Sequence, residues 1–225
     1  MTRPWQILET VPTAEGPLAL SRRGEREFLI TIDGRVLMNG VANRSELALA
    51  HRVCSDPTVT ALPAPRVLVG GLGLGFTLRA ALDRLPAAAR VTVAELNEVV
   101  VRWCRGPVAV LTDNALDDPR VEVKIADVAR VIRAAAQAHT TYDAIVLDLY
   151  EGPHEATQRR NDPFYGARAL DTTRAALRRG GLFAVWSEEP DAAFEKRLDQ
   201  AGFRTDRHRA GKGGRRHVIY VARSG

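Results

Sequence analysis

The apolar and polar positions in the first third of the chain alternate as they do in β-strands and then change to helical spacing. Residues Glu27–Ile32 alternate in this way. The pair Asp33-Gly34 follows, which is typical of the two-residue turn of a β-hairpin, and the apolar run after it has the pattern of a return strand. From Ser45 to Cys54 the apolar residues recur at helical spacing. The pattern predicts a β-hairpin followed by a helix.

A proline-rich stretch, DPTVTALPAPR, separates this region from the rest of the chain. Beyond it, short apolar runs typical of buried strands alternate with amphipathic helical segments, and repeated units of this kind favour a mostly parallel sheet with helices on both faces. We therefore expect an α/β, doubly wound, Rossmann-like fold. The boundary is placed near Ala64, with a hairpin-plus-helix segment in residues 1–64 and the Rossmann-like domain in residues 65–225.

The predicted elements of the second unit follow one another regularly. The expected strands are Arg66–Gly71, Val91–Leu96, Val121–Ile125, Asp143–Tyr150 and Leu182–Ser187. The expected helices are Phe76–Leu85, Asn97–Arg105, Asp127–His139, Gly166–Arg179 and Pro190–Gly202. Two final runs, Phe203–His208 and His217–Ala222, predict an antiparallel pair that closes the sheet. A long polar loop is expected over residues 151–163.

The composition limits the classes of protein to be considered. The chain has 225 residues, 45% of them hydrophobic and 26% charged, which is enough for one α/β domain with a full core. No apolar run approaches the roughly 20 residues of a membrane span, and the first residues lack the apolar core of a signal peptide. We expect a cytoplasmic protein with no membrane association. The two cysteines make no disulfide framework and the histidines lack zinc-site spacing, so no metal is expected.

The net charge of +5 comes with one dense basic cluster, Arg207–His217. Such a cluster can attract nucleic acid. However, the GKGG within it is turn chemistry between two strands, and no aromatic side chains stand among the basic ones to stack on bases. We interpret the cluster as a hairpin turn and do not expect a nucleic-acid partner.

The stretch VLVGGLGLGFTL, residues 67–78, has four glycines within six residues, between a strand and a helix. Glycine permits positive φ and lets a ligand approach the backbone, and the start of a helix offers unpaired N–H groups. We expect a nucleotide-like ligand against Gly71, Gly73 and Gly75. Phe76 stands where the dinucleotide fingerprint has its third glycine. The G-x-G-x-G pattern therefore favours an adenosine-type cofactor such as S-adenosylmethionine over NAD.

Acidic residues follow the ends of the next strands. Glu95 lies where a carboxylate can accept hydrogen bonds from both hydroxyls of a ribose. Asp127 is a typical helix cap and would also lie beside the adenine ring, where it could accept from the amino group. Asp148 closes an apolar strand, where a charge needs a reason, and could deprotonate a nucleophile or hold a cationic amine. Tyr150 and Glu151 lie just beyond it and are candidates to share that work.

From residue 66 to 187 the chain resembles the spermidine synthase-like family of class I S-adenosylmethionine-dependent transferases. The matching stretches, in order, are GGLGLGFTLR, VTVAELNEVVV, LDDPRVEVKIAD, YDAIVLDLYEGP, FYGARAL and LRRGGLFAVWS. The leading residues also look like the N-terminal β segment of that family. The resemblance implies a seven-stranded sheet, and because the family is often dimeric it makes a homodimer possible.

The resemblance also implies roles for the candidate residues. Asp148 would be the catalytic aspartate, and Glu151 the second carboxylate of the family's D-x-x-D signature, which helps to hold the polyamine. The residues around the adenosine half would be Gly71, Gly73, Glu95 and Asp127.

The chain departs from true spermidine synthases at several positions. Their glycine loop usually reads GGGDGG, with an acid near the amine-bearing tail of the cofactor, and we assign the position of that aspartate to Leu74. The family's N-terminal H-E pair is represented at most by Glu46, and the chain is basic overall, whereas a polyamine groove is acidic. We expect methyl transfer from S-adenosylmethionine to a small-molecule acceptor. The alternatives are aminopropyl transfer from decarboxylated S-adenosylmethionine to a polyamine, and a non-catalytic adenosyl-ligand-binding protein.

Overall fold

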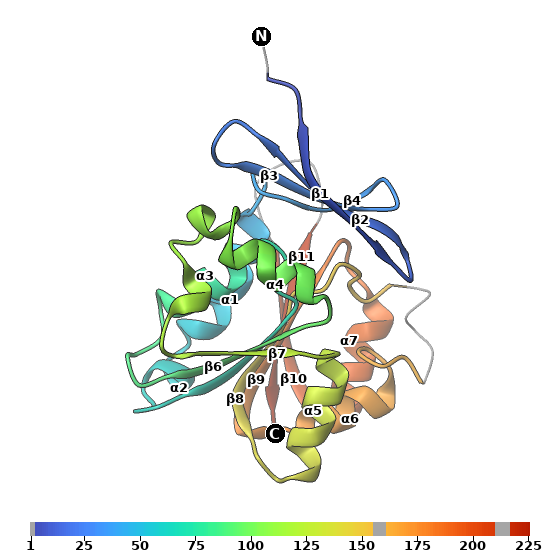
Figure 1. Cartoon of the computed structure of the whole chain (residues 1–225). Helices are drawn as coiled ribbons and strands as arrows, with labels where there is room; N and C mark the ends of the chain where they lie inside the picture. Colours follow the sequence, from blue (N-terminus) through green and yellow to red (C-terminus); the bar gives the residue numbers. More distant parts are fainter. Residues whose placement is uncertain (1–2, 155–160, 210–216) are drawn as a thin grey trace.

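The computed structural model describes residues 3–154, 161–209 and 217–225, and these residues form two β-sheets (Figure 1). The larger sheet has seven strands in the order β10-β11-β9-β8-β5-β6-β7. Strands β5 to β9 are parallel, and β11 and β10 complete the sheet as an antiparallel pair. This order confirms the predicted mostly parallel, seven-stranded sheet. The strands are β5 (Arg66–Gly70), β6 (Arg90–Glu95), β7 (Val121–Ile125), β8 (Tyr142–Leu147), β9 (Leu177–Ser187), β10 (Phe203–Arg209) and β11 (Val218–Ser224).

Helices cover both faces of this sheet, so successive side chains of the central strands are buried on opposite sides. Val67 and Val69 of β5 belong to one core cluster, whereas Leu68 between them belongs to the other. The first cluster includes side chains of α1 (Arg44–Cys54), α2 (Pro57–Thr60), α3 (Phe76–Leu82) and α4 (Glu98–Arg105). The second includes side chains of α5 (Val128–Gln137), α6 (Ala167–Ala175) and α7 (Ala192–Gln200). Short 3-10 helices lie at Ala109–Leu111 and Ala115–Asp117.

The smaller sheet is an antiparallel meander near the N-terminus, above α4 in Figure 1. Its strands are β1 (Gln6–Thr13), β2 (Gly16–Arg23), β3 (Glu27–Ile32) and β4 (Arg35–Asn39). The predicted hairpin is therefore only the second half of a four-stranded sheet. The first half is harder to find from sequence because β1 has no fully buried position, so its apolar and polar residues do not alternate regularly.

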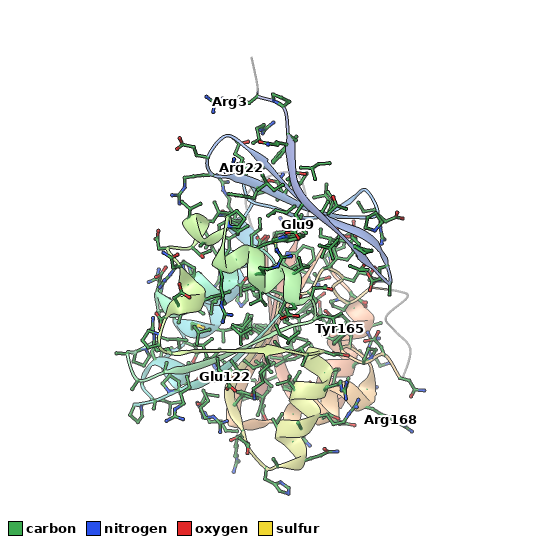
Figure 2. The ribbon with its side chains drawn as sticks, viewed as in Figure 1. Arg3, Glu9, Arg22, Glu122, Tyr165 and Arg168 are labelled. Atoms are coloured by element: carbon green, nitrogen blue, oxygen red, sulfur yellow. The ribbon has the colours of Figure 1, made fainter. Side chains whose placement is uncertain are left out.

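A polar cluster joins this small sheet to the rest of the molecule. The Glu9 carboxylate on β1 accepts two hydrogen bonds from the Arg102 guanidinium, at 2.9 and 2.6 Å, and one from Nε1 of Trp103, at 2.7 Å. These three contacts lower the pKa of Glu9. Figure 2 shows Glu9 where the small sheet meets α4.

The helix predicted to end at Arg179 ends instead at Ala175, and β9 begins at Leu177. Leu177 pairs with Tyr142 of β8 and is 5% exposed. Burial of this leucine in the sheet therefore outweighs the helical pattern that runs through it. The closing antiparallel pair is confirmed, but residues 210–216 of the basic cluster between its strands lie outside the described residues, as do residues 155–160 of the predicted loop. Within the part of the chain that is described, no helix is both long and apolar enough to span a membrane.

Candidate active site

The glycine loop connects the end of β5 to the start of α3 in a left-handed backbone conformation. The φ angles are 86° at Gly71, 51° at Gly73 and 83° at Gly75. A Cβ atom on Gly71 would collide with the backbone carbonyl oxygen of Asp148, and one on Gly73 would collide with the terminal methyl group of Met38. The loop therefore requires glycine for its own conformation and packing, and it brings its backbone close to the end of β8.

Glu95 is held against this loop at the end of β6. Its side chain is only 7% exposed. One carboxylate oxygen accepts from the backbone N–H of Leu72 at 2.9 Å, and the other from that of Asn97 at 2.8 Å. Burial raises the pKa of Glu95, and the backbone donors oppose that rise. Because a carboxylate oxygen has more than one lone pair, each retains the capacity to accept from a ribose hydroxyl.

Asp127 caps α5, because its side chain accepts from the backbone N–H of Ala129 at 2.8 Å. Its contact with an adenine ring stays a prediction.

The sequence analysis did not identify Leu96 and Ile125 as candidate site residues. Leu96 directly follows Glu95, and Ile125 is the register partner of Glu95 on β7, so both lie at the same edge of the sheet. They are 63% and 48% exposed, so they offer an aliphatic surface to a flat ring. The signal for Leu96 was its position directly after the strand-ending acid.

Asp148 follows β8, and its backbone N–H donates to the Gly70 carbonyl oxygen at 2.9 Å. Its side chain accepts from the Thr77 hydroxyl at 2.5 Å, and Thr77 is a buried residue of α3. Burial raises the pKa of Asp148 to about 7, the Thr77 hydrogen bond opposes this, and the nearby charge of Glu46 adds to it. A carboxyl group with a pKa near neutrality suits proton transfer at physiological pH.

Glu46 was a minor candidate in the sequence, and the structure brings it into the vicinity of Asp148. It lies in the first turn of α1 and is 7% exposed. Its carboxylate accepts from the Ser45 hydroxyl at 2.6 Å. Its position on the apolar side of an amphipathic helix was the sequence signal that could have identified Glu46 as a functional candidate, because buried charges are rare.

Tyr150 and Glu151 lie further out. Tyr150 is 44% exposed, and the Arg35 guanidinium of β4 stands 5.9 Å from the centre of its ring. The Glu151 side chain is 62% exposed, and its carboxylate is 3.7 Å from Nε2 of His154. The Glu151 backbone carbonyl accepts from the buried Tyr165 hydroxyl at 2.9 Å. The catalytic roles of Tyr150 and Glu151 stay predictions.

The assignment of Leu74 to the aspartate position of the family loop is wrong. Leu74 is fully buried in the core cluster that includes α1 and α3, so its side chain does not line the outer surface of the loop. A direct alignment gives the same result. When GGLGLG, residues 70–75, is aligned with GGGDGG, the aspartate of the family motif falls at Gly73 and not at Leu74. Met38 occupies the space next to that position. Leu74 therefore does not discriminate between the two forms of the cofactor.

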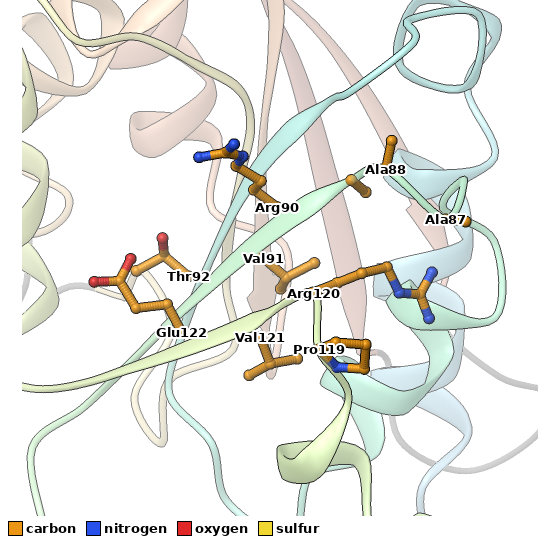
Figure 3. A pocket seen from close by; sticks show the side chains of 10 residues that line it. Ala87, Ala88, Arg90, Val91, Thr92, Pro119, Arg120, Val121 and Glu122 are labelled. Carbon is orange, nitrogen blue, oxygen red and sulfur yellow. The ribbon is translucent and has the colours of Figure 1, made fainter.

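Two surface hollows lie away from these residues. One, of about 390 Å³, lies at the amino-terminal ends of β6 and β7, where Arg90, Thr92 and Glu122 contribute to its lining (Figure 3). The other, of about 350 Å³, lies between α5 and α6. Ligands of open parallel sheets bind at the carboxyl ends of the strands. We therefore place the candidate site at the glycine loop, Glu95 and Asp148.

Comparison with known proteins identifies related sequences. Residues 48–198 match the family model described as the spermine/spermidine synthase domain. Polyamine aminopropyltransferase 1 of Hyperthermus butylicus is 31% identical over 147 residues, which are 64% of this chain and 48% of that protein. Polyamine aminopropyltransferase 1 of Streptomyces coelicolor is 29% identical over 191 residues, which are 81% of this chain and 33% of that protein. The chain thus spans between a third and a half of the length of these relatives.

Solved structures share the fold of this chain. Spermidine synthase from Thermotoga maritima superposes with a TM-score of 0.73 at 18% identity, covering 98% of this chain and 73% of that chain. Human methyltransferase-like protein 13 in complex with SAH gives a TM-score of 0.58 at 20% identity, covering 79% of this chain and 78% of that chain. At these identities the likeness shows the shared α/β fold alone.

The comparisons contradict the expectation of methyl transfer. The curated relatives are named as polyamine aminopropyltransferases and not as methyltransferases. The expectation failed because it depended on Leu74, which is a core residue, and on the net charge of the whole chain, which does not describe the charge at the site.

Proposed function

Since the chain belongs to the spermine/spermidine synthase family, we propose that it transfers the aminopropyl group of decarboxylated S-adenosylmethionine to a small amine of the polyamine class. The observation that supports this most directly is Asp148: its carboxyl group has a pKa of about 7 and accepts from the Thr77 hydroxyl, and its backbone carbonyl lies against Gly71 of the glycine loop. The site therefore combines a base suited to neutral pH with a loop suited to an adenosine ligand.

The residues at the strand ends fit the adenosine half of the donor. Glu95 would accept from the ribose hydroxyls, because both of its oxygens are already oriented by backbone N–H groups. Asp127 would accept from the adenine amino group, with Leu96 against the face of the ring. The backbone at Gly71 and Gly73 would lie against the donor, in the left-handed conformation that glycine permits.

Asp148 would act on the acceptor. The donor supplies an electrophilic carbon next to a positively charged sulfur. The acceptor arrives as an ammonium ion and gives a proton to the Asp148 carboxylate. Its nitrogen then forms a bond to that carbon as the carbon–sulfur bond breaks, and the sulfur keeps the electron pair. The positive charge moves from sulfur to nitrogen, so alignment and charge placement supply most of the rate enhancement.

The charge around the acceptor side suits a cationic substrate although the chain as a whole is basic. Glu46 lies close enough to Asp148 to raise its pKa. The loop after β8 lies against the end of β9, because a Cβ atom on Gly152 would lie 2.7 Å from Cα of Ser187. The exposed residues Glu188 and Glu189 follow at that strand end. Acids therefore gather where a polyamine would bind.

The test measures binding and turnover in the purified protein. Calorimetric titration compares decarboxylated S-adenosylmethionine with S-adenosylmethionine, and mass spectrometry follows the conversion of putrescine and a panel of longer polyamines. We expect tighter binding of the decarboxylated form and a mass increase of one aminopropyl group. Donor binding without transfer to any amine would favour a non-catalytic binding protein. Methylated products, or binding of neither donor, would refute the proposal.

A further inference from the structure

Glu46 is a buried carboxylate. It is more than nine-tenths buried, and its hydrogen-bond partner is the hydroxyl of the adjacent residue, Ser45. Within the part of the chain that the structure describes, no arginine, lysine or histidine forms an ion pair with it. An unpaired buried carboxylate is costly to the fold, so its position needs a reason.

The helix that carries this carboxylate lies next to the elements that hold Asp148. Helix α1 packs against α3, which contributes Thr77, and against β8, which leads into Asp148. The charge of Glu46 acts on the Asp148 carboxyl group. Tyr165 is a third titratable group there: burial raises the pKa of its hydroxyl, and the charges of Asp162 and Asp148 add to that rise. Two carboxylates from distant parts of the chain thus influence one another, and among the described residues neither forms an ion pair.

Glu151 differs from Glu46 in its surroundings. It follows Asp148 by three residues, but 62% of its side chain is exposed and its carboxylate lies near His154. Because Glu46 is buried and Glu151 is exposed, Glu46 is the better candidate to form a cation site together with Asp148.

We propose that Glu46 and Asp148 together bind the reacting ammonium group of the acceptor, so that Glu46 is a substrate-binding residue of this site. This inference rests on the proposed function. The ammonium group lies between the two carboxylates and gives a proton to Asp148, and the nitrogen then forms its bond to carbon as the carbon–sulfur bond breaks. Glu46 balances the positive charge that the nitrogen acquires.

The test compares Glu46→Gln with the control Glu122→Gln, which removes an exposed carboxylate of β7 away from the site. Loss of a hydrogen bond between charged groups predicts a KM for putrescine about 10- to 100-fold higher in Glu46→Gln, with donor affinity unchanged. Removing the charge also lowers the pKa of Asp148, so the rise of activity with pH moves to lower pH. Glu46→Asp keeps the charge and should keep the pH profile closer to that of the wild type.

A wild-type KM and pH profile in Glu46→Gln would overturn the inference, and so would the same losses in the control Glu122→Gln. The proposed function itself fails if the wild-type protein transfers nothing. The pairing is then tested without turnover, by carbon-13 NMR titration of the Asp148 carboxyl group, assigned with Asp148→Asn. We expect Glu46→Gln to lower its pKa and putrescine to lower it in the wild type. An unchanged titration in both cases refutes the pairing whether or not transfer occurs.

Discussion

Replacing Gly71 or Gly73 by alanine should have different consequences, although both residues have positive φ. The left-handed conformation costs an alanine about 1–2 kcal/mol at either position. At Gly71 the new methyl group also meets the carbonyl oxygen of Asp148, whose carbonyl carbon would lie 3.2 Å away. That carbonyl belongs to backbone fixed by the hydrogen bond from Asp148 to Gly70, so relief requires the end of β8 to move. At Gly73 the obstacle is the tip of Met38, a flexible side chain that can rotate away.

We expect Gly71→Ala to lower the free energy of unfolding by about 2–4 kcal/mol, because it adds the weakening of a hydrogen bond worth about 1 kcal/mol and local strain to the conformational cost. Gly73→Ala should lose about 1–2 kcal/mol. Because a displacement of about 1 Å at a reacting group can cost about 100-fold in rate, Gly71→Ala should also lose most aminopropyl transfer. Urea denaturation and the steady-state assay measure both effects. Equal stability and equal turnover in the two variants would refute the argument that fixed backbone, rather than φ alone, sets the cost.

Other consequences can be tested separately. Replacing Glu95 by glutamine should weaken donor binding about 10- to 100-fold in calorimetry, because charge-assisted hydrogen bonds to the ribose are lost; unchanged affinity would exclude a ribose contact. Transfer by the wild type should rise with pH through about 7 as Asp148 ionises, and Asp148→Asn should abolish transfer. The folded-state pKa of Asp148 lies above its ordinary value of 3.8, so ionisation destabilises the fold between about pH 4 and 7, and Asp148→Asn should flatten that part of the stability profile. Glu9→Gln should weaken the contact with Arg102 and so speed amide hydrogen exchange in β1 to β4 but not in β5. Exchange rates in β1 to β4 that match those of the wild type would contradict this expectation.

The parallel sheet could be predicted because its central strands are buried on both faces and read as uninterrupted apolar runs. The glycine loop and the acids at the strand ends could be predicted for a similar reason, since each lies directly after such a run. The start of β9 could not be predicted, because the helical pattern continues through Leu177 and only pairing with Tyr142 decides its conformation. The proximity of Glu46 to Asp148 also depends on how α1 docks, which no local pattern encodes. For Leu74, the sequence did not show which side of the loop the side chain faces.

Strand β4 touches both loops that form the site, through Met38 against the glycine loop and Arg35 over the ring of Tyr150. The two contacts come from the small N-terminal sheet. In contrast, Glu95 is the last residue of β6 and Asp148 directly follows β8, and both of these strands belong to the larger sheet. The small sheet therefore packs against both loops without contributing a strand to the parallel sheet. We expect substitutions in β4 to reshape the candidate site while Glu95 and Asp148 keep their positions in the parallel sheet.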